Sequence, residues 1–122
     1  MNKLTRQEED VMQAIWHTGE GSVKTFLDAM LPPRPPYTTI ASTVKNLEKK
    51  GFVNSRLLGN TYLYIPQITE EAYKQQFMQG FVQDYFNNSY KEMVNFFVDS
   101  KKLKPNELKE IIDMIEGKTK TK

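Results

Sequence analysis

Two short runs of strand-forming residues lie on either side of Gly59-Asn60, and they constrain the fold more than any other feature of the sequence. The first run covers residues 52–58 and the second covers residues 61–65, after which Pro66 ends the pattern. Glycine and asparagine tolerate the backbone angles of a tight turn, while aromatic and β-branched residues favour strands. The pattern therefore predicts a β-hairpin in the middle of a chain of 122 residues.

Three helical patterns precede this hairpin. Thr5 is followed three residues later by Glu8, a spacing typical of a capping box at the start of a helix. Ser22 can cap a second, shorter helix, which the prolines at positions 32 and 33 end. A third helix is predicted from residue 38 to residue 50, with an apolar stripe that consists of Ile40, Val44 and Leu47.

The order of three helices and a hairpin is typical of a winged helix-turn-helix domain, which we assign to residues 1–67. Residues 68–117 show three further helical patterns, and a Lys/Thr-rich tail at 118–122 is expected to be disordered. The predicted fold class is therefore mostly α with a small β-hairpin: a winged helix-turn-helix DNA-binding domain followed by a three-helix dimerisation segment.

The second half of the chain carries more large apolar side chains than three short helices can bury, because small domains bury a smaller share of their surface. Packing against a second copy by two-fold symmetry is the simplest way to cover them. We therefore expect a homodimer whose interface is formed by Tyr73, Phe77, Phe81, Tyr85, Phe86, Met93, Phe97, Leu108, Ile111, Ile112 and Ile115.

The third predicted helix places hydrogen-bond donors opposite its apolar stripe. This outer face carries Thr38, Ser42, Lys45 and Lys49 and no acidic residue at its centre. Hydroxyls and amines bind DNA phosphates or base edges, and the free N–H groups near Thr38 and Thr39 favour a phosphate. At the tip of the hairpin, where a wing commonly contacts DNA, no acid is nearby. We expect further contacts there from Arg56, Asn60 and Thr61.

The charge distribution agrees with this assignment. The whole chain has a net charge of only +2, but residues 34–65 contain five basic residues and one acidic residue. Local positive charge of this kind is typical of a phosphate-binding surface, although charge clusters are also common on solvated faces.

Several other classes of protein are excluded or disfavoured. The absence of cysteine excludes disulfides, zinc fingers and thiol chemistry. A polar amino terminus without a signal-peptide core, and the lack of an apolar run of roughly 20 residues, predict a cytoplasmic protein without membrane insertion. His17 is the one histidine, and no carboxylate pair, phosphate loop or nucleophile–base pattern is present. We expect no catalysis, no cofactor and no metal.

Three segments resemble the penicillinase-repressor (BlaI/MecI) family, over nearly the whole chain. They are the opening helix at residues 4–16 with its late tryptophan, the segment from Tyr37 to Val53 that contains Leu-Glu-Lys-Lys-Gly, and Tyr62-Leu-Tyr-Ile-Pro66. Ala41 and Asn46 depart from the family, because some members have arginine at the first position and many have it at the second. Base readout is therefore assigned to Thr38, Thr39, Ser42, Lys45 and Asn46, with a different operator.

The resemblance implies a repressor of β-lactam resistance operons that dimerises through its carboxy-terminal helices on a palindromic operator in double-stranded DNA. It also implies release from DNA by cleavage, after signalling by a membrane sensor protease. The family is cleaved at an Asn-Phe bond in the second carboxy-terminal helix, and this chain offers Asn95-Phe96 or, by ungapped alignment, Phe96-Phe97. The cysteines of the copper-responsive branch are absent.

Two alternatives remain open at the level of the sequence. The aromatic residues of the second half could line a pocket for a small-molecule ligand that controls the regulator. A winged-helix module could also bind proteins and never touch DNA, in which case the outer face of its third helix would be apolar.

Overall fold

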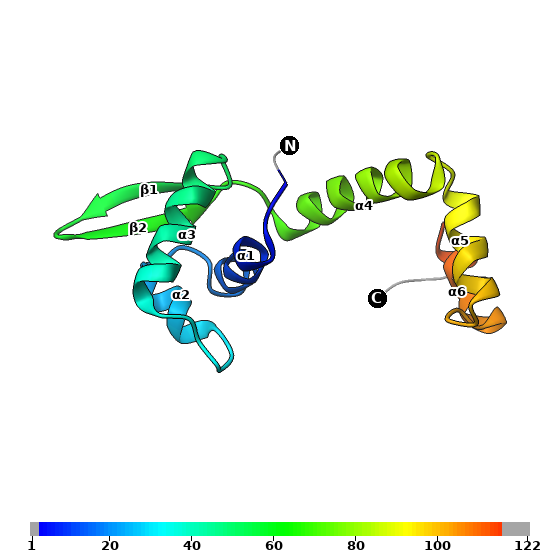
Figure 1. Ribbon diagram of the computed structural model, residues 1–122, viewed down its shortest axis with the longest axis horizontal. Coiled ribbons are helices and arrows are strands. Elements are labelled where there is room, and N and C mark those ends of the chain that lie inside the picture. Colours follow the sequence, from blue (N-terminus) through cyan, green and yellow to red (C-terminus); the bar gives the residue numbers. More distant parts are fainter. Residues whose placement is uncertain (1–2, 116–122) are drawn as a thin grey trace. The chain divides into compact units, whose positions relative to one another are not determined.

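The computed structural model describes residues 3–115, in which Figure 1 shows helices and one two-stranded antiparallel sheet. The chain separates into two compact units, residues 1–76 and residues 77–122. The elements are α1 (Arg6–Thr18), α2 (Val23–Ala29), α3 (Tyr37–Lys49), β1 (Val53–Leu58), β2 (Thr61–Pro66), α4 (Glu70–Phe86), α5 (Tyr90–Asp99) and α6 (Pro105–Ile115). Their order and type confirm the predicted fold class of a winged helix-turn-helix followed by three helices.

Local capping chemistry sets where the first helices begin. Thr5 Oγ1 accepts a hydrogen bond from the backbone N–H of Glu8 at 3.1 Å, and Glu8 Oε1 accepts from the N–H of Thr5 at 2.9 Å. The predicted capping box is therefore confirmed. Ser22 Oγ caps α2 by accepting from the N–H of Thr25 at 3.2 Å. Helix α3 begins one residue earlier than predicted and has no side-chain cap.

The core of the first unit lies between α1, α2 and α3 and is closed by the base of the hairpin. The predicted stripe of α3 is confirmed, because its three side chains are fully buried. Burying a large apolar side chain contributes about 1.5–3 kcal/mol to folding. The fully buried residues of the three helices are Val11, Met12, Ile15, Phe26, Ile40, Val44 and Leu47.

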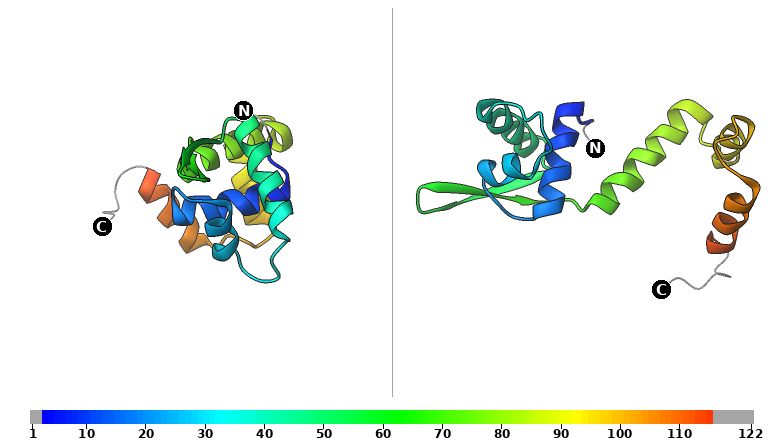
Figure 2. Two further views of the ribbon diagram at one scale, coloured as in Figure 1. Left: turned by 90° about the vertical axis from the view of Figure 1, so that its left-hand side faces the viewer. Right: turned by 90° about the horizontal axis from the view of Figure 1, so that it is seen from below.

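The hairpin projects from the three helices, as Figures 1 and 2 show. Its strands pair from Val53 opposite Pro66 to Leu58 opposite Thr61, and the turn contains Gly59 with φ +62°. This confirms the hairpin that Gly59-Asn60 predicts, with β1 starting one residue later than expected. The base of the hairpin is also joined to the segment between α1 and α2: Tyr64 N–H donates to the carbonyl of Gly21 at 2.7 Å, and Gly21 N–H donates back to the carbonyl of Tyr64 at 3.1 Å.

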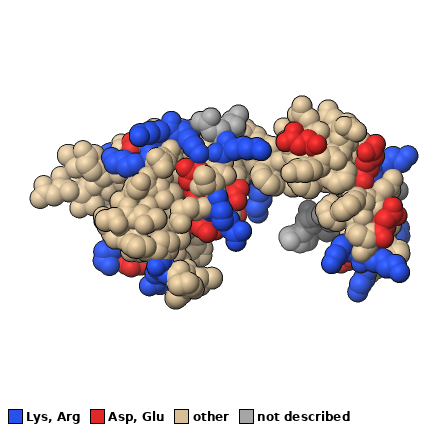
Figure 3. Space-filling model, viewed as in Figure 1, with Lys and Arg blue, Asp and Glu red and all other residues tan. Residues whose placement is uncertain are grey.

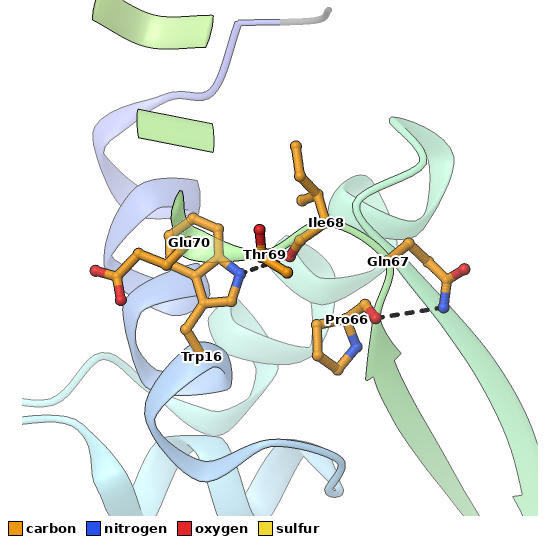
Figure 4. Close-up of a pocket in the computed structure, with 6 residues that line it drawn as sticks. All are labelled: Trp16, Pro66, Gln67, Ile68, Thr69 and Glu70. Atoms are coloured by element: carbon orange, nitrogen blue, oxygen red, sulfur yellow. Dashed lines mark hydrogen bonds between the residues drawn. The ribbon is translucent and has the colours of Figure 1, made fainter. Parts of the chain in front are cut away.

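The start of α4 belongs to the first unit. The ring of Tyr73 lies 5.5 Å from that of Trp16 and 5.9 Å from that of Phe52, and its hydroxyl donates to Glu9 Oε2 at 2.5 Å. Trp16 Nε1 donates to the carbonyl of Ile68 at 2.8 Å (Figure 4). Tyr73 is thus packed against its own winged-helix unit, and the argument that it needs cover from a second copy was wrong.

The second unit consists of the rest of α4 with α5 and α6. The ring of Phe81 lies 5.1 Å from Tyr85 and 5.7 Å from Phe86, and Phe86 lies 5.7 Å from Phe96. Val82 is the one buried side chain among the described residues of this unit. No helix in the described part of the chain is both long and apolar enough to cross a membrane.

Candidate nucleic-acid interface

The outer face of α3 is polar and open to solvent. Its six exposed residues all carry a hydroxyl, amide or ammonium group that can donate hydrogen bonds. They lie opposite the buried stripe, as the 3.6-residue period predicts. We call this surface the donor face; it comprises Thr38, Thr39, Ser42, Lys45, Asn46 and Lys49.

The one acidic residue of α3 is held to the side of the donor face. Glu48 is half-buried, and its Oε2 accepts a hydrogen bond from Ser55 Oγ of β1 at 2.7 Å. This contact directs the carboxylate toward the hairpin. The donor face itself therefore carries no negative charge that would repel a phosphate.

The hairpin borders the donor face. Lys45 Nζ lies 5.4 Å from the centre of the Tyr62 ring, a cation–π contact that holds the ammonium between α3 and β2. Ser42 and Lys45 line a hollow of about 420 Å³ together with Asn60 and Thr61 of the hairpin. Sequence reasoning missed Tyr62. The period of two along the strand could have found it, because Tyr62 lies on the same side of the hairpin as the buried Tyr64.

The turn of the hairpin exposes Asn60 and Thr61, but Arg56 is not free of acids. Arg56 Nη2 lies 2.6 Å from Glu20 Oε2, and its Nε donates to the same oxygen at 2.7 Å. The prediction that no acid lies near the tip was wrong. Glu20 is distant along the chain, and the contact between Gly21 and Tyr64 brings it to β1.

Two other basic residues of segment 34–65 also have defined partners. Lys50 Nζ binds Glu8 Oε1 at 2.7 Å, and Arg34 donates to the carbonyls of Met30 and Asp28. Three cations of this segment have no ion pair among the described residues: Lys45 and Lys49 on the donor face, and Arg34 outside it. Figure 3 shows Lys and Arg gathered near the carboxyl end of α3.

The predicted dimerisation residues of the second unit differ in exposure. Phe77, Tyr85, Phe97 and Ile111 are exposed, whereas Phe81, Phe86, Met93 and Leu108 are half-buried. The side chains of Ile112 and Ile115 lie outside the described residues. The two candidate cleavage bonds lie in α5, where Asn95, Phe96 and Phe97 are all exposed.

The structure also bears on the two alternatives. A protein-binding module was expected to have an apolar outer face on α3. The donor face is polar instead. A hollow of about 370 Å³ beside Trp16 (Figure 4) is lined by residues 66–70 and lies in the first unit. It is therefore not the pocket in the helical half that a ligand-controlled regulator was expected to have.

A family model and several relatives match nearly the whole chain. The family model described as penicillinase repressor matches residues 4–117. The penicillinase repressor of Bacillus licheniformis is 24% identical over 115 residues, covering 93% of this chain and 90% of that protein. The methicillin resistance regulatory proteins MecI of Mammaliicoccus sciuri and Staphylococcus aureus (strain N315) are 21% and 20% identical, each with 95% of both chains covered.

Among solved structures, a chain from the work titled "Mechanism for regulation of DNA binding of Bordetella bronchiseptica BpsR by 6-hydroxynicotinic acid" aligns with a TM-score of 0.48 and 15% identity. It covers 95% of this chain and 76% of the other. The match of the family model extends from the first helix to beyond α6, and thus includes both units. This chain belongs to the penicillinase repressor family of transcriptional regulators.

Proposed function

We propose that the chain is a repressor that binds double-stranded DNA with the donor face of α3 in the major groove. The observation that carries this proposal is an exposed helical face of donors without a carboxylate, bordered by a hairpin. The major groove is wide enough for a helix, and hydroxyls, an amide and ammonium groups can contact base edges or phosphates there. In this arrangement Ser42, Lys45 and Asn46 read bases, Lys49 binds the backbone, and the hairpin contacts the DNA beside α3.

The test compares Lys45→Ala and Ser42→Ala with wild type on a duplex that the wild-type protein selects from a randomised DNA pool. A good bidentate base contact is worth about 1–3 kcal/mol, so Lys45→Ala should weaken binding by about one order of magnitude. If Lys45 contacts a phosphate instead, the plot of log affinity against log salt concentration should become shallower, its slope decreasing in magnitude by about one. Fluorescence anisotropy measures both quantities.

Lys91→Ala is the matched control, because Lys91 is an exposed lysine of α5 and its loss changes the net charge equally. Thermal unfolding should be the same in all variants, since the substituted side chains are exposed. Equal affinity of Lys45→Ala, Ser42→Ala and wild type would contradict the assignment of the donor face.

We further propose that the chain works as a homodimer joined through its second unit. Tyr85 is 72% exposed and Phe96 is 56% exposed, although both rings contact other aromatic rings of the unit. Aromatic side chains are enriched at protein interfaces and supply much of their binding energy. A two-fold axis would place two copies of α3 about one DNA turn or a multiple apart, matching a palindromic operator.

The names of the relatives suggest the target, and the family resemblance implies how it is controlled. We propose that the repressed genes concern β-lactam resistance, and that cleavage at Asn95-Phe96 or Phe96-Phe97 follows a signal from a membrane sensor protease. The exposure of both bonds on α5, which has no buried residue, supports access by a protease. Immunoblots of cells treated with a β-lactam should show a shortened chain, and intact protein after induction of the target genes would contradict cleavage.

A further inference from the structure

The outer end of the hairpin is apolar and exposed. Leu57 is 58% exposed and Leu58 is 57% exposed, and no charged residue occurs from Leu57 to Tyr62. Figure 3 shows the same feature: on the displayed face, the outer end of the hairpin carries neither basic nor acidic residues. Exposed apolar side chains gathered at a projecting tip indicate a site of contact with another molecule.

The base of the hairpin is firmly held, so that the tip is presented in a defined direction. At the base, Tyr64 is buried and bonded to Gly21, and nearer the turn Arg56 is paired with Glu20. Strand pairing continues without a bulge from this base to Leu58 opposite Thr61. At about 3.4 Å per residue, Leu58 lies roughly 10 Å beyond the pair of Ser55 and Tyr64.

We propose that the end of the hairpin, with Leu57 on one face of β1 and Leu58 on the other, is an apolar wedge that enters the DNA minor groove and opens a base step. This inference rests on the proposed DNA-binding function and extends it to the hairpin. Minor-groove proteins commonly insert leucine and similar side chains between base pairs, which kinks the duplex. The one cation of β1, Arg56, is neutralised by Glu20, so the hairpin is not organised around a phosphate-binding charge at its tip.

DNA is favoured as the occupant because the tip continues the donor face. Asn60 and Thr61, beside the two leucines, line the same hollow as Ser42 and Lys45 of α3. A stable protein partner would instead need about 800 Å² of surface on each side. Two leucines at the end of a hairpin offer only a small part of that area, whereas the minor groove is about 6 Å wide and accepts a narrow wedge.

The experiment uses the full-length protein and a duplex that the wild type selects from a randomised pool. A series of duplexes carries 2-aminopurine at successive positions on both sides of the bases protected by the protein. Wild type should raise 2-aminopurine fluorescence at one step, because unstacking relieves quenching, and end-to-end energy transfer should report a bend. The double substitution Leu57→Ser and Leu58→Ser should abolish both signals and weaken binding by about tenfold.

Leu31→Ser is the matched control, because Leu31 is 87% exposed and lies outside the hairpin. It should leave fluorescence, bend and affinity as in wild type. Circular dichroism and sedimentation should be the same for all three proteins. Wild-type binding without unstacking or bending, or with signals that survive the double substitution, would overturn the wedge and leave the proposed function intact.

Two other results would also be decisive. A double variant with a changed sedimentation coefficient would assign the leucines to contact between copies of the chain and overturn the wedge. Failure of wild type to select any duplex would overturn both the proposed function and the wedge.

Discussion

Lys49 and Lys50 are consecutive in the sequence but have different environments. Lys49 is exposed on the donor face, whereas Lys50 is half-buried and binds Glu8 Oε1 at 2.7 Å and the carbonyl of Lys3 at 2.9 Å. The side chain of Glu8 is only 6% exposed. Because Glu8 also accepts from the N–H of Thr5, this one carboxylate both caps α1 and joins it to the end of α3.

This pair makes stability depend on pH. Burial alone would raise the pKa of Glu8, but hydrogen bonds from Lys50 and Thr5 and the charge of Lys50 hold that pKa below its ordinary value of 4.5. A carboxyl whose pKa is lowered by folding stabilises the protein above its unfolded pKa, and this contribution is lost as the pH falls through the folded pKa. Glu8→Gln should therefore lower the free energy of unfolding by about 2 kcal/mol at neutral pH.

The difference between wild type and Glu8→Gln should shrink as the pH falls below the ordinary value of 4.5. Urea unfolding followed by circular dichroism measures it across the acidic range. Lys50→Met should destabilise the protein to a similar extent, while Lys49→Met at the exposed neighbour should not. A loss of stability that is equal at all pH values would show that the charge of Glu8 is not its cause.

At the scale of elements, local chemistry made most of the fold predictable. The capping box at Thr5 and Glu8, the cap at Ser22 and the turn at Gly59-Asn60 act within a few residues, so the sequence displays them directly. The predicted start of α3 differs from the structure by one residue, because Pro36 occupies the cap position without a side-chain hydrogen bond. The polar character of the donor face follows from the same helical period that predicts the buried stripe.

Contacts between elements were not predictable in this way. Glu20 and Arg56 form an ion pair across 36 positions of sequence, and the hairpin alone gives no sign of it. The placement of Tyr73 against Trp16 is a similar case, since a count of aromatic residues does not say which of them the first unit covers. Such pairs depend on which elements meet in space, and that depends on the packing of the whole unit.

At the scale of the whole molecule, the two units differ in how well they bury their apolar residues. The first has a continuous core, whereas Val82 is the one buried side chain among the described residues of the second. The described residues of that unit bury little apolar surface, so they gain little hydrophobic stabilisation by themselves. Association with a second copy would supply the missing cover and, by the same contact, join two DNA-binding units.

Tyr85→Asp tests this coupling. Tyr85 is 72% exposed, so the substitution should leave the fold of a single chain unchanged, but it would bury a charge in a dimer interface that includes this residue. We expect sedimentation to show monomers at concentrations where wild type is dimeric. Affinity for a duplex with two half-sites should fall by at least about one hundredfold, because the second α3 no longer benefits from the high effective concentration of a joined pair.

Affinity of Tyr85→Asp for a duplex with one half-site should stay close to that of wild type, since the donor face is unaltered. Gln83→Asp is the matched control: Gln83 is exposed on the same helix, and at about 100° per residue it points away from Tyr85. It adds the same charge and should preserve the dimer. If Tyr85→Asp is monomeric yet binds both duplexes as wild type does, dimerisation contributes nothing to DNA affinity. If it stays dimeric at low concentration, Tyr85 lies outside the interface.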